Sequence, residues 1–149
     1  VLNMKKNEIV KVKLVKEKDL FVNNIHIKET KDCYKVILNF LDNPDREHFI
    51  ILGLSTNNKI CIISTISIGT LNSSLVHPRE VFKIAILSNC SKIIISHNHP
   101  SGNCKPSQED KNITNRLIDS GNLLGINILD HIIVSDESYF SFKENELLF

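Results

Sequence analysis

The sequence lacks a strong charge of either sign, and this limits the partners that it predicts. Its 149 residues hold 18 Lys and Arg against 17 Asp and Glu, a formal net charge of +1. Domains that bind nucleic acid through its phosphates tend to carry a clear basic excess or a concentrated basic stripe. The only such concentration is the N-terminal stretch MKKNEIVKVKLVKEKD, interpreted as a solvated chain end. Composition therefore gives little support for direct nucleic-acid binding.

The sequence also lacks a long apolar run, a secretory leader and a paired-cysteine motif. No apolar run approaches the roughly 18 residues needed to cross a bilayer. The four cysteines, Cys33, Cys61, Cys90 and Cys104, include no C-x-x-C spacing, and no charged-then-apolar leader precedes them. They are interpreted as buried or incidental thiols in a reducing compartment. These absences predict a cytoplasmic protein that does not associate with membranes.

Internal repeats and low-complexity tracts are absent too, which leaves one ordinary domain. A chain of 149 residues can bury one real core but not two. Its hydrophobic share of 42% and charged share of 23% are those of a soluble globular protein. We expect an N-terminal extension over residues 1–27 and a single domain over residues 28–149. Apolar and basic residues nearly alternate over 9–16, which predicts a half-exposed strand. A flexible chain end is expected before it.

Hydrophobic periodicity predicts interleaved helices and strands over the rest of the chain. Helices are expected at 28–42, 78–89 and 107–124, with Pro78 as a first helical residue and Gly125 near the last helix end. Buried strands are expected at 48–54, 60–69, 92–96 and 126–136, the first two forming a hairpin. The expected fold class is α/β in the broad sense (α+β), a mixed β-sheet flanked by helices in a single domain.

The most informative stretch is IISHNHPSGNCKPSQEDKN, residues 94–112, where two histidines follow an apolar strand. Side chains two positions apart on an extended segment point to the same face, with α-carbons about 6.5 to 7 Å apart. His97 and His99 can therefore converge on one metal ion. Catalytic zinc takes three protein ligands and keeps a position open, and Asp110 in the next helix's first turn can supply the third.

Each part of this pattern also has an explanation that needs no metal. Ser107 and Asp110 fit a helix N-cap followed by a first-turn carboxylate. Two histidines at a strand end fit a polar lip around a cleft. The combined spacing, H-x-H, seven residues, Ser, two residues, Asp, is much harder to explain without a metal.

The combined pattern resembles the JAMM motif of the JAB/MPN metalloprotease superfamily. The segment SHNHPSGN…PSQED resembles the sequences of the RadC family of bacteria in particular. The similarity continues through GTLNSSLVHPREVF (69–82), LLGINILDHIIVSD (123–136) and YFSFKE (139–144), so it covers roughly residues 28–149. It implies a JAB/MPN-like fold, related to that of cytidine deaminases.

The resemblance also implies roles for five residues. His97, His99 and Asp110 would bind one zinc ion per chain, and Ser107 would help hold the oxyanion formed when zinc-bound water attacks a carbonyl. Glu47 occupies the place of the superfamily's general base, a carboxylate that takes the water's proton and passes it to the leaving amine. Glu80 is the rival base, but it lies inside a predicted helix, where a solvated residue is expected.

Three functions follow as expectations. The leading one is a zinc-dependent hydrolase, a metallopeptidase that cleaves a peptide or isopeptide bond in a peptide or protein substrate. The alternative is a DNA-repair-associated protein that acts by binding nucleic acid or protein without hydrolysis. RadC proteins carry a helix-hairpin-helix region upstream, for which residues 1–27 are too short. A third is a binding module with a closed structural metal site that includes Cys104.

Three further features stay open at the level of sequence. His131 is either an outer partner of the metal site or a core-edge histidine satisfied by the backbone. Asn103 stands where family members often carry Asp, which removes one possible carboxylate near the site. Whether the chain acts alone or as a homodimer is not indicated by any pattern.

Overall fold

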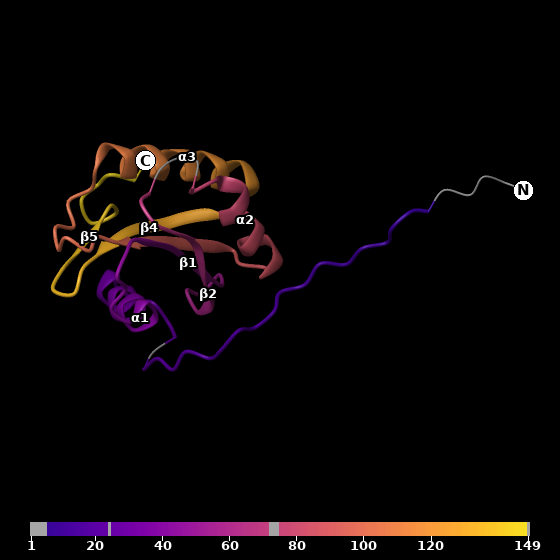
Figure 1. The fold of residues 1–149 in the computed structure, drawn as a ribbon, viewed down its shortest axis with the longest axis horizontal. Coiled ribbons are helices and arrows are strands. Elements are labelled where there is room, and N and C mark those ends of the chain that lie inside the picture. Colours follow the sequence, from indigo (N-terminus) through magenta and orange to yellow (C-terminus); the bar gives the residue numbers. More distant parts are fainter. Residues whose placement is uncertain (1–5, 24, 72–74, 149) are drawn as a thin grey trace, which may run out of the picture.

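The computed structural model describes residues 6–23, 25–71 and 75–148 of the chain (Figure 1). The elements follow in the order α1 (Thr30–Leu41), β1 (His48–Leu54), β2 (Ile60–Ile68), α2 (Pro78–Leu87), β3 (Lys92–Asn98), α3 (Gln108–Leu124), β4 (Asn127–Val134) and β5 (Tyr139–Ser141). Among these residues, none of the helices has both the length and the apolar character needed to cross a membrane.

The strands form one five-stranded sheet in the order β2-β1-β3-β4-β5. Strands β3 and β4 are parallel, and the other neighbours are antiparallel. A parallel pair needs a crossover connection, and α3 supplies it here. The predicted α+β fold, a mixed sheet with flanking helices, is confirmed and is consistent with the JAB/MPN fold.

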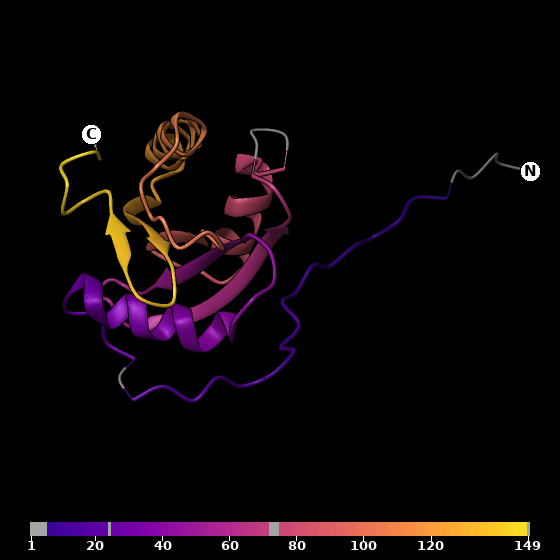
Figure 2. The same ribbon diagram turned by 60° about the vertical axis from the view of Figure 1, so that its left-hand side comes forward.

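Helices cover both faces of the sheet. Helices α2 and α3 lie on one face and α1 lies on the other (Figures 1 and 2). Side chains of strand β1 alternate between the two faces of the sheet. Phe49 and Ile51 pack toward α2 and α3, and Ile50 and Leu52 pack toward α1. Each of these fully buried side chains stabilises the fold by about 1.5–3 kcal/mol through loss of apolar surface from water. Strand β1 is therefore packed on both of its faces.

Two helix boundaries lie where local sequence signals predict them, the start of α2 and the end of α3. Pro78 is the first residue of α2, and the ring of His77 caps that helix by accepting a hydrogen bond from the Arg79 amide at 3.1 Å. Helix α3 ends at Gly125, whose φ of 72° is the left-handed conformation that glycine adopts without strain. Both boundaries depend on residues adjacent in sequence.

The strand predicted at 9–16 is wrong. Over this segment the chain is extended and exposed but has no strand partner among the described residues. Alternating side chains alone do not make a strand, because a strand also needs a neighbour for its backbone hydrogen bonds. The nearest pairing is a single antiparallel bridge between His26 and Lys59.

One strand was missed, and one strand end differs from the prediction at a candidate ligand. Strand β5 (Tyr139–Ser141) was missed, because three residues are too few for a period-two pattern. Strand β3 runs on to Asn98 rather than ending at Ser96, so His97 belongs to the strand. Because β3 is the central strand of the sheet, this extension means that the backbone of His97 is paired on both sides.

Candidate metal centre

The two histidines and the aspartate come from two elements that meet at one end of the sheet. His97 lies in β3, where it pairs with Phe49 on one side and Ile133 on the other. His99 follows just after the strand, and its amide donates to the Val134 carbonyl at 2.9 Å, continuing the pairing with β4. Asp110 lies in the first turn of α3.

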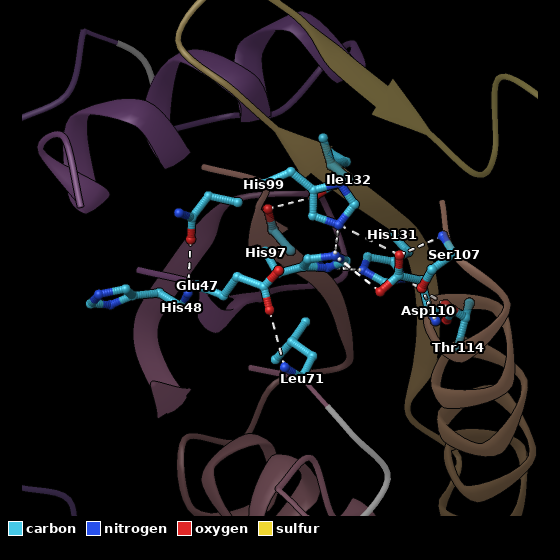
Figure 3. A network of polar contacts seen from close by, with 12 residues as sticks. Glu47, His48, Leu71, His97, His99, Ser107, Asp110, Thr114, His131 and Ile132 are labelled. Carbon is cyan, nitrogen blue, oxygen red and sulfur yellow. Dashed lines mark hydrogen bonds and ion pairs between the residues drawn. The ribbon is translucent and has the colours of Figure 1, made fainter. Parts of the chain in front are cut away.

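Their side chains converge, as the sequence spacing predicts (Figure 3). One ligand atom from each of His97, His99 and Asp110 lies within 4.8 Å of the others. The distances are 3.0 Å between the two histidine Nε2 atoms, 3.2 Å from His97 Nε2 to Asp110 Oδ1, and 3.5 Å from His99 Nε2 to Asp110 Oδ2. The His97 side chain is completely buried and that of His99 is 15% exposed. Solvent therefore reaches the group from the His99 side.

Asp110 also forms the helix cap that Ser107 and Asp110 predict without a metal. The Ser107 hydroxyl accepts from the Asp110 amide at 3.0 Å, and the Ser107 amide donates to Asp110 Oδ2 at 2.7 Å. This capping box and the convergence with the histidines use the same carboxylate. The cap orients Asp110, so the two explanations do not exclude each other.

His99 is held so that its Nε2 atom faces the group. Its Nδ1 lies 2.7 Å from the Asn103 carbonyl, which can only accept, so Nδ1 carries the proton. In the neutral ring, Nε2 then has a free lone pair directed inward. Asn103 contributes its backbone here, and its side chain instead accepts from the Lys105 amide. The expected loss of a carboxylate at Asn103 therefore leaves this contact intact.

The electrostatics favour a cation between the three side chains. Burial alone would raise the Asp110 pKa, but the bonds from His97 and His99 lower it well below the usual range. Burial lowers the pKa of His97, while the hydrogen bond to Asp110 raises that of His99. Two imidazole nitrogens and a carboxylate that face one another repel unless a proton or metal ion lies between them. Nitrogen and oxygen donors of this kind are the ligands that zinc takes in proteins, so the residues fit a metal ion.

Glu47 lies directly before β1 and beside this group (Figure 3). Its Oε2 accepts from the Leu71 amide at 3.0 Å. Its negative charge partly offsets the lowering of the His97 pKa by burial and adds to the raising of the His99 pKa, so the carboxylate acts on both rings.

Glu80, the rival to Glu47, is held on α2 by cations. Its carboxylate lies 2.8 Å from Lys83 Nζ and 3.8 Å from Arg79 Nε, and the Lys83 contact lowers its pKa. A carboxylate paired in this way has a weakened tendency to accept a proton.

Cys104 does not join the candidate ligands. It is buried, and its thiol contacts the Ser138 carbonyl at 3.4 Å. In the part of the chain that the structure describes, the metal-binding group consists of His97, His99 and Asp110 alone. The closed site with Cys104 as a fourth ligand is thus not supported.

Residues 27–147 match the family described as RadC-like JAB domain. The chain belongs to this family. A UPF0758 protein of Alkaliphilus oremlandii is 50% identical over 127 residues, which cover 85% of this chain and 55% of the relative. UPF0758 proteins of Clostridioides difficile and Rubrobacter xylanophilus are 54% and 52% identical, covering 78% and 71% of this chain and 50% and 46% of the relatives. This RadC-like JAB domain thus spans about half the length of the curated relatives it matches.

Sequence reasoning assigned no structural role to Asn98, the residue between the two histidines of this JAB domain. Its Oδ1 accepts from the His48 amide at 2.7 Å and its Nδ2 donates to the Arg46 carbonyl at 3.0 Å. Arg46 and His48 are the two neighbours of Glu47. No local pattern signals such a contact, because it joins residues 50 and 52 positions apart.

Proposed function

We propose that this chain is a zinc-dependent hydrolase, a metallopeptidase of the JAMM type that cleaves a peptide or isopeptide bond in a protein or peptide substrate. The observation that supports it most is the convergence of His97, His99 and Asp110 at 3.0–3.5 Å, with the Glu47 carboxylate beside them. Family membership supports the same proposal.

His97, His99 and Asp110 would hold the zinc ion. When bound, zinc polarises a carbonyl and makes a coordinated water more acidic. Three protein ligands leave a position open, and the partial exposure of His99 gives a substrate access on that side.

Glu47 would act as general base and acid. Its carboxylate would take a proton from the attacking water and return it to the leaving amine. The Leu71 amide holds one of its oxygens, and Asn98 holds both neighbouring residues, so the carboxylate has a fixed position before substrate arrives.

Ser107 would stabilise the oxyanion. Its hydroxyl oxygen already accepts the Asp110 amide hydrogen at 3.0 Å, so the oxygen is fixed and its own hydrogen can be donated. A positioned donor of this kind acts on charge that develops in the transition state.

The test separates metal binding from hydrolysis. Elemental analysis of protein purified without added zinc should find about one zinc per chain, lost in His97→Ala and in Asp110→Ala. Wild type is then assayed on a panel of peptides and isopeptide-linked conjugates. Glu47→Gln should keep the zinc and lose hydrolysis, whereas Glu80→Gln, its matched control, should keep both.

Two results would contradict the proposal. Full hydrolysis by Glu47→Gln would exclude Glu47 as the base. Stoichiometric zinc with no turnover of any substrate, together with DNA binding that weakens steeply with salt, would favour the non-hydrolytic, DNA-repair-associated role instead.

A further inference from the structure

From His97 Nδ1, a chain of buried hydrogen bonds runs through His131 to Thr114. We propose that Thr114 and His131 are positioning residues that lock His97 in the one tautomer able to bind a metal through Nε2. The inference depends on the metal site of the proposed function, but not on hydrolysis. The hydrogen-bonded chain also connects β3, which carries His97, to α3, which carries Asp110, because His131 lies in β4 and Thr114 lies in α3.

The direction of this chain is set at Thr114. Its Oγ1 lies 2.6 Å from the Asp110 carbonyl oxygen and 2.6 Å from His131 Nδ1. A carbonyl only accepts, so the single hydroxyl hydrogen of Thr114 goes to Asp110. Thr114 must then accept from His131, which places a proton on His131 Nδ1.

The next step transfers this constraint to His97. His131 is completely buried, and its ring nitrogens face His97 and the Thr114 hydroxyl rather than a carboxylate, so the ring is neutral and carries one proton. With that proton on Nδ1, the His131 Nε2 atom can only accept. It lies 2.8 Å from His97 Nδ1, so His97 donates from Nδ1. The His97 Nε2 atom is left with its lone pair directed at Asp110 and His99.

The surroundings keep the two rings in this arrangement. Phe142 stacks on His131 with ring centroids 4.6 Å apart, and Phe49 stacks on His97 with centroids 6.1 Å apart. Thr114, His131 and His97 are all 0% exposed, so water does not offer an alternative partner. The other tautomer of His97 would point an N–H at the place of the metal. It would also set two acceptors against each other, either at the His97–His131 contact or, if His131 changes tautomer as well, at the contact between Thr114 Oγ1 and the Asp110 carbonyl.

Isosteric substitution at Thr114 gives the sharpest test. In Thr114→Val the acceptor for His131 Nδ1–H is gone, so His131 can carry its proton on Nε2 and reverse the tautomer of His97. We expect zinc affinity, measured by competition with a chromophoric chelator, to fall by about 10- to 100-fold. Thr114→Ser keeps the hydroxyl and should restore the wild-type affinity. Thr65→Val, the same change at an exposed position of β2, should have no effect.

A second pair of variants and a spectroscopic readout separate positioning from folding. In His131→Gln the amide can accept from His97 and donate to Thr114, so affinity should stay closer to wild type than in His131→Leu. Nitrogen-15 NMR of the imidazoles should show His97 protonated at Nδ1 in wild type and Thr114→Ser, and at Nε2 or at both positions in Thr114→Val.

The possible outcomes distinguish this inference from the proposed function. Tight zinc binding without hydrolysis would contradict the proposed function and leave the inference intact. Equal affinity and an unchanged His97 tautomer in Thr114→Val would overturn the inference. If the wild type binds no zinc, the tautomer measured by NMR still decides: reversal in Thr114→Val supports the locking role, and no change overturns it.

Discussion

Among single residues, Asn98 makes a contact that links the candidate ligands to the candidate base. It lies between His97 and His99 in sequence, and its amide bonds the Arg46 carbonyl and the His48 amide on either side of Glu47. Only a side chain with both a donor and an acceptor at its end can make these two bonds together. One residue of β3, placed between two candidate ligands, therefore holds the backbone on both sides of Glu47.

Replacing Asn98 with Ala should affect stability and catalysis but not the metal ligands. The side chain is buried, so its loss leaves the His48 amide and the Arg46 carbonyl without this partner, a cost of about 1–3 kcal/mol. Denaturant unfolding measures this loss, and elemental analysis should find unchanged zinc. Asn98→Asp is the matched variant, since it keeps the acceptor but loses the donor. A free energy of unfolding equal to wild type in Asn98→Ala would show that these bonds contribute nothing.

The opposite pKa shifts of the two histidines predict how metal binding depends on pH. A metal binds the deprotonated ring, so a proton on His99 competes with it. The Asp110 contact raises the His99 pKa above its ordinary value, whereas burial lowers the His97 pKa and so favours the neutral ring. Zinc affinity should be constant well above the raised pKa and fall by up to about tenfold per pH unit below it.

Titrating zinc against a chelator whose own protonation is known, between about pH 5 and pH 8, measures this dependence. Affinity that stays constant across this range would mean that His99 is not protonated in the metal-free protein. A fall of about a hundredfold per unit would require two competing protons and would place His97 among them.

At the scale of elements, the first turn of α3 has two tasks. It caps the N-terminus of the helix with a capping box, and it places the Asp110 side chain next to the histidines. Because the helix dipole favours a carboxylate at this end, the turn stabilises the charged form of Asp110 even before a metal binds. A substitution at Ser107 therefore tests the cap and the proposed oxyanion role together, and a second substitution is needed to separate them.

Ser107→Ala should destabilise the protein by about 0.5–2 kcal/mol, the usual effect of losing an N-cap side chain. It should also lower hydrolysis, since the hydroxyl donor is gone. Ser107→Asp should recover the stability, because Asp caps helices well, but not the hydrolysis, because a carboxylate cannot donate to an oxyanion. Thermal unfolding and turnover of the same preparations give both quantities. Recovery of hydrolysis in Ser107→Asp would assign Ser107 a purely structural task.

The elements that were predictable from sequence are those whose signals are local. Pro78 and Gly125 mark helix boundaries through their own backbone conformations, and Ser107 with Asp110 marks a cap within one turn. The hydrogen-bonded chain from Thr114 to His97 and the Asn98 contacts depend on which strands become neighbours. Their partners lie 17 to 52 positions apart, and periodicity carries no information about such pairs.

At the scale of the whole molecule, the sheet order places the candidate site. The parallel strands β3 and β4 have their carboxyl ends at the same end of the sheet, and α3, which connects the two strands, starts there too. Ligands of open α/β sheets bind outside the carboxyl ends of such strands. Strand β1 is antiparallel to β3 and begins at this end of the sheet, since Phe49 near its start pairs with His97. Glu47, which precedes β1, therefore lies at the same end.

The N-terminal segment contributes little to this architecture up to its twentieth residue. Residues 6–19 are exposed, and the Lys16–Asp19 ion pair at 3.1 Å is local. Leu20, Val22 and Ile27 instead pack against the core on the α1 side of the sheet. The boundary between extension and domain in terms of stability is thus expected near residue 20 rather than residue 28.

Two truncations test this boundary. Deleting residues 1–18 should shift the melting temperature by less than about 2 °C and leave zinc content unchanged, because no described contact with the domain is lost. Deleting residues 1–28 also removes three apolar side chains and the His26–Lys59 bridge, and should lower the melting temperature by several times as much. Scanning calorimetry on both proteins decides. A large loss from the shorter deletion would show that the exposed segment is bound in solution, to this domain or to another copy of the chain.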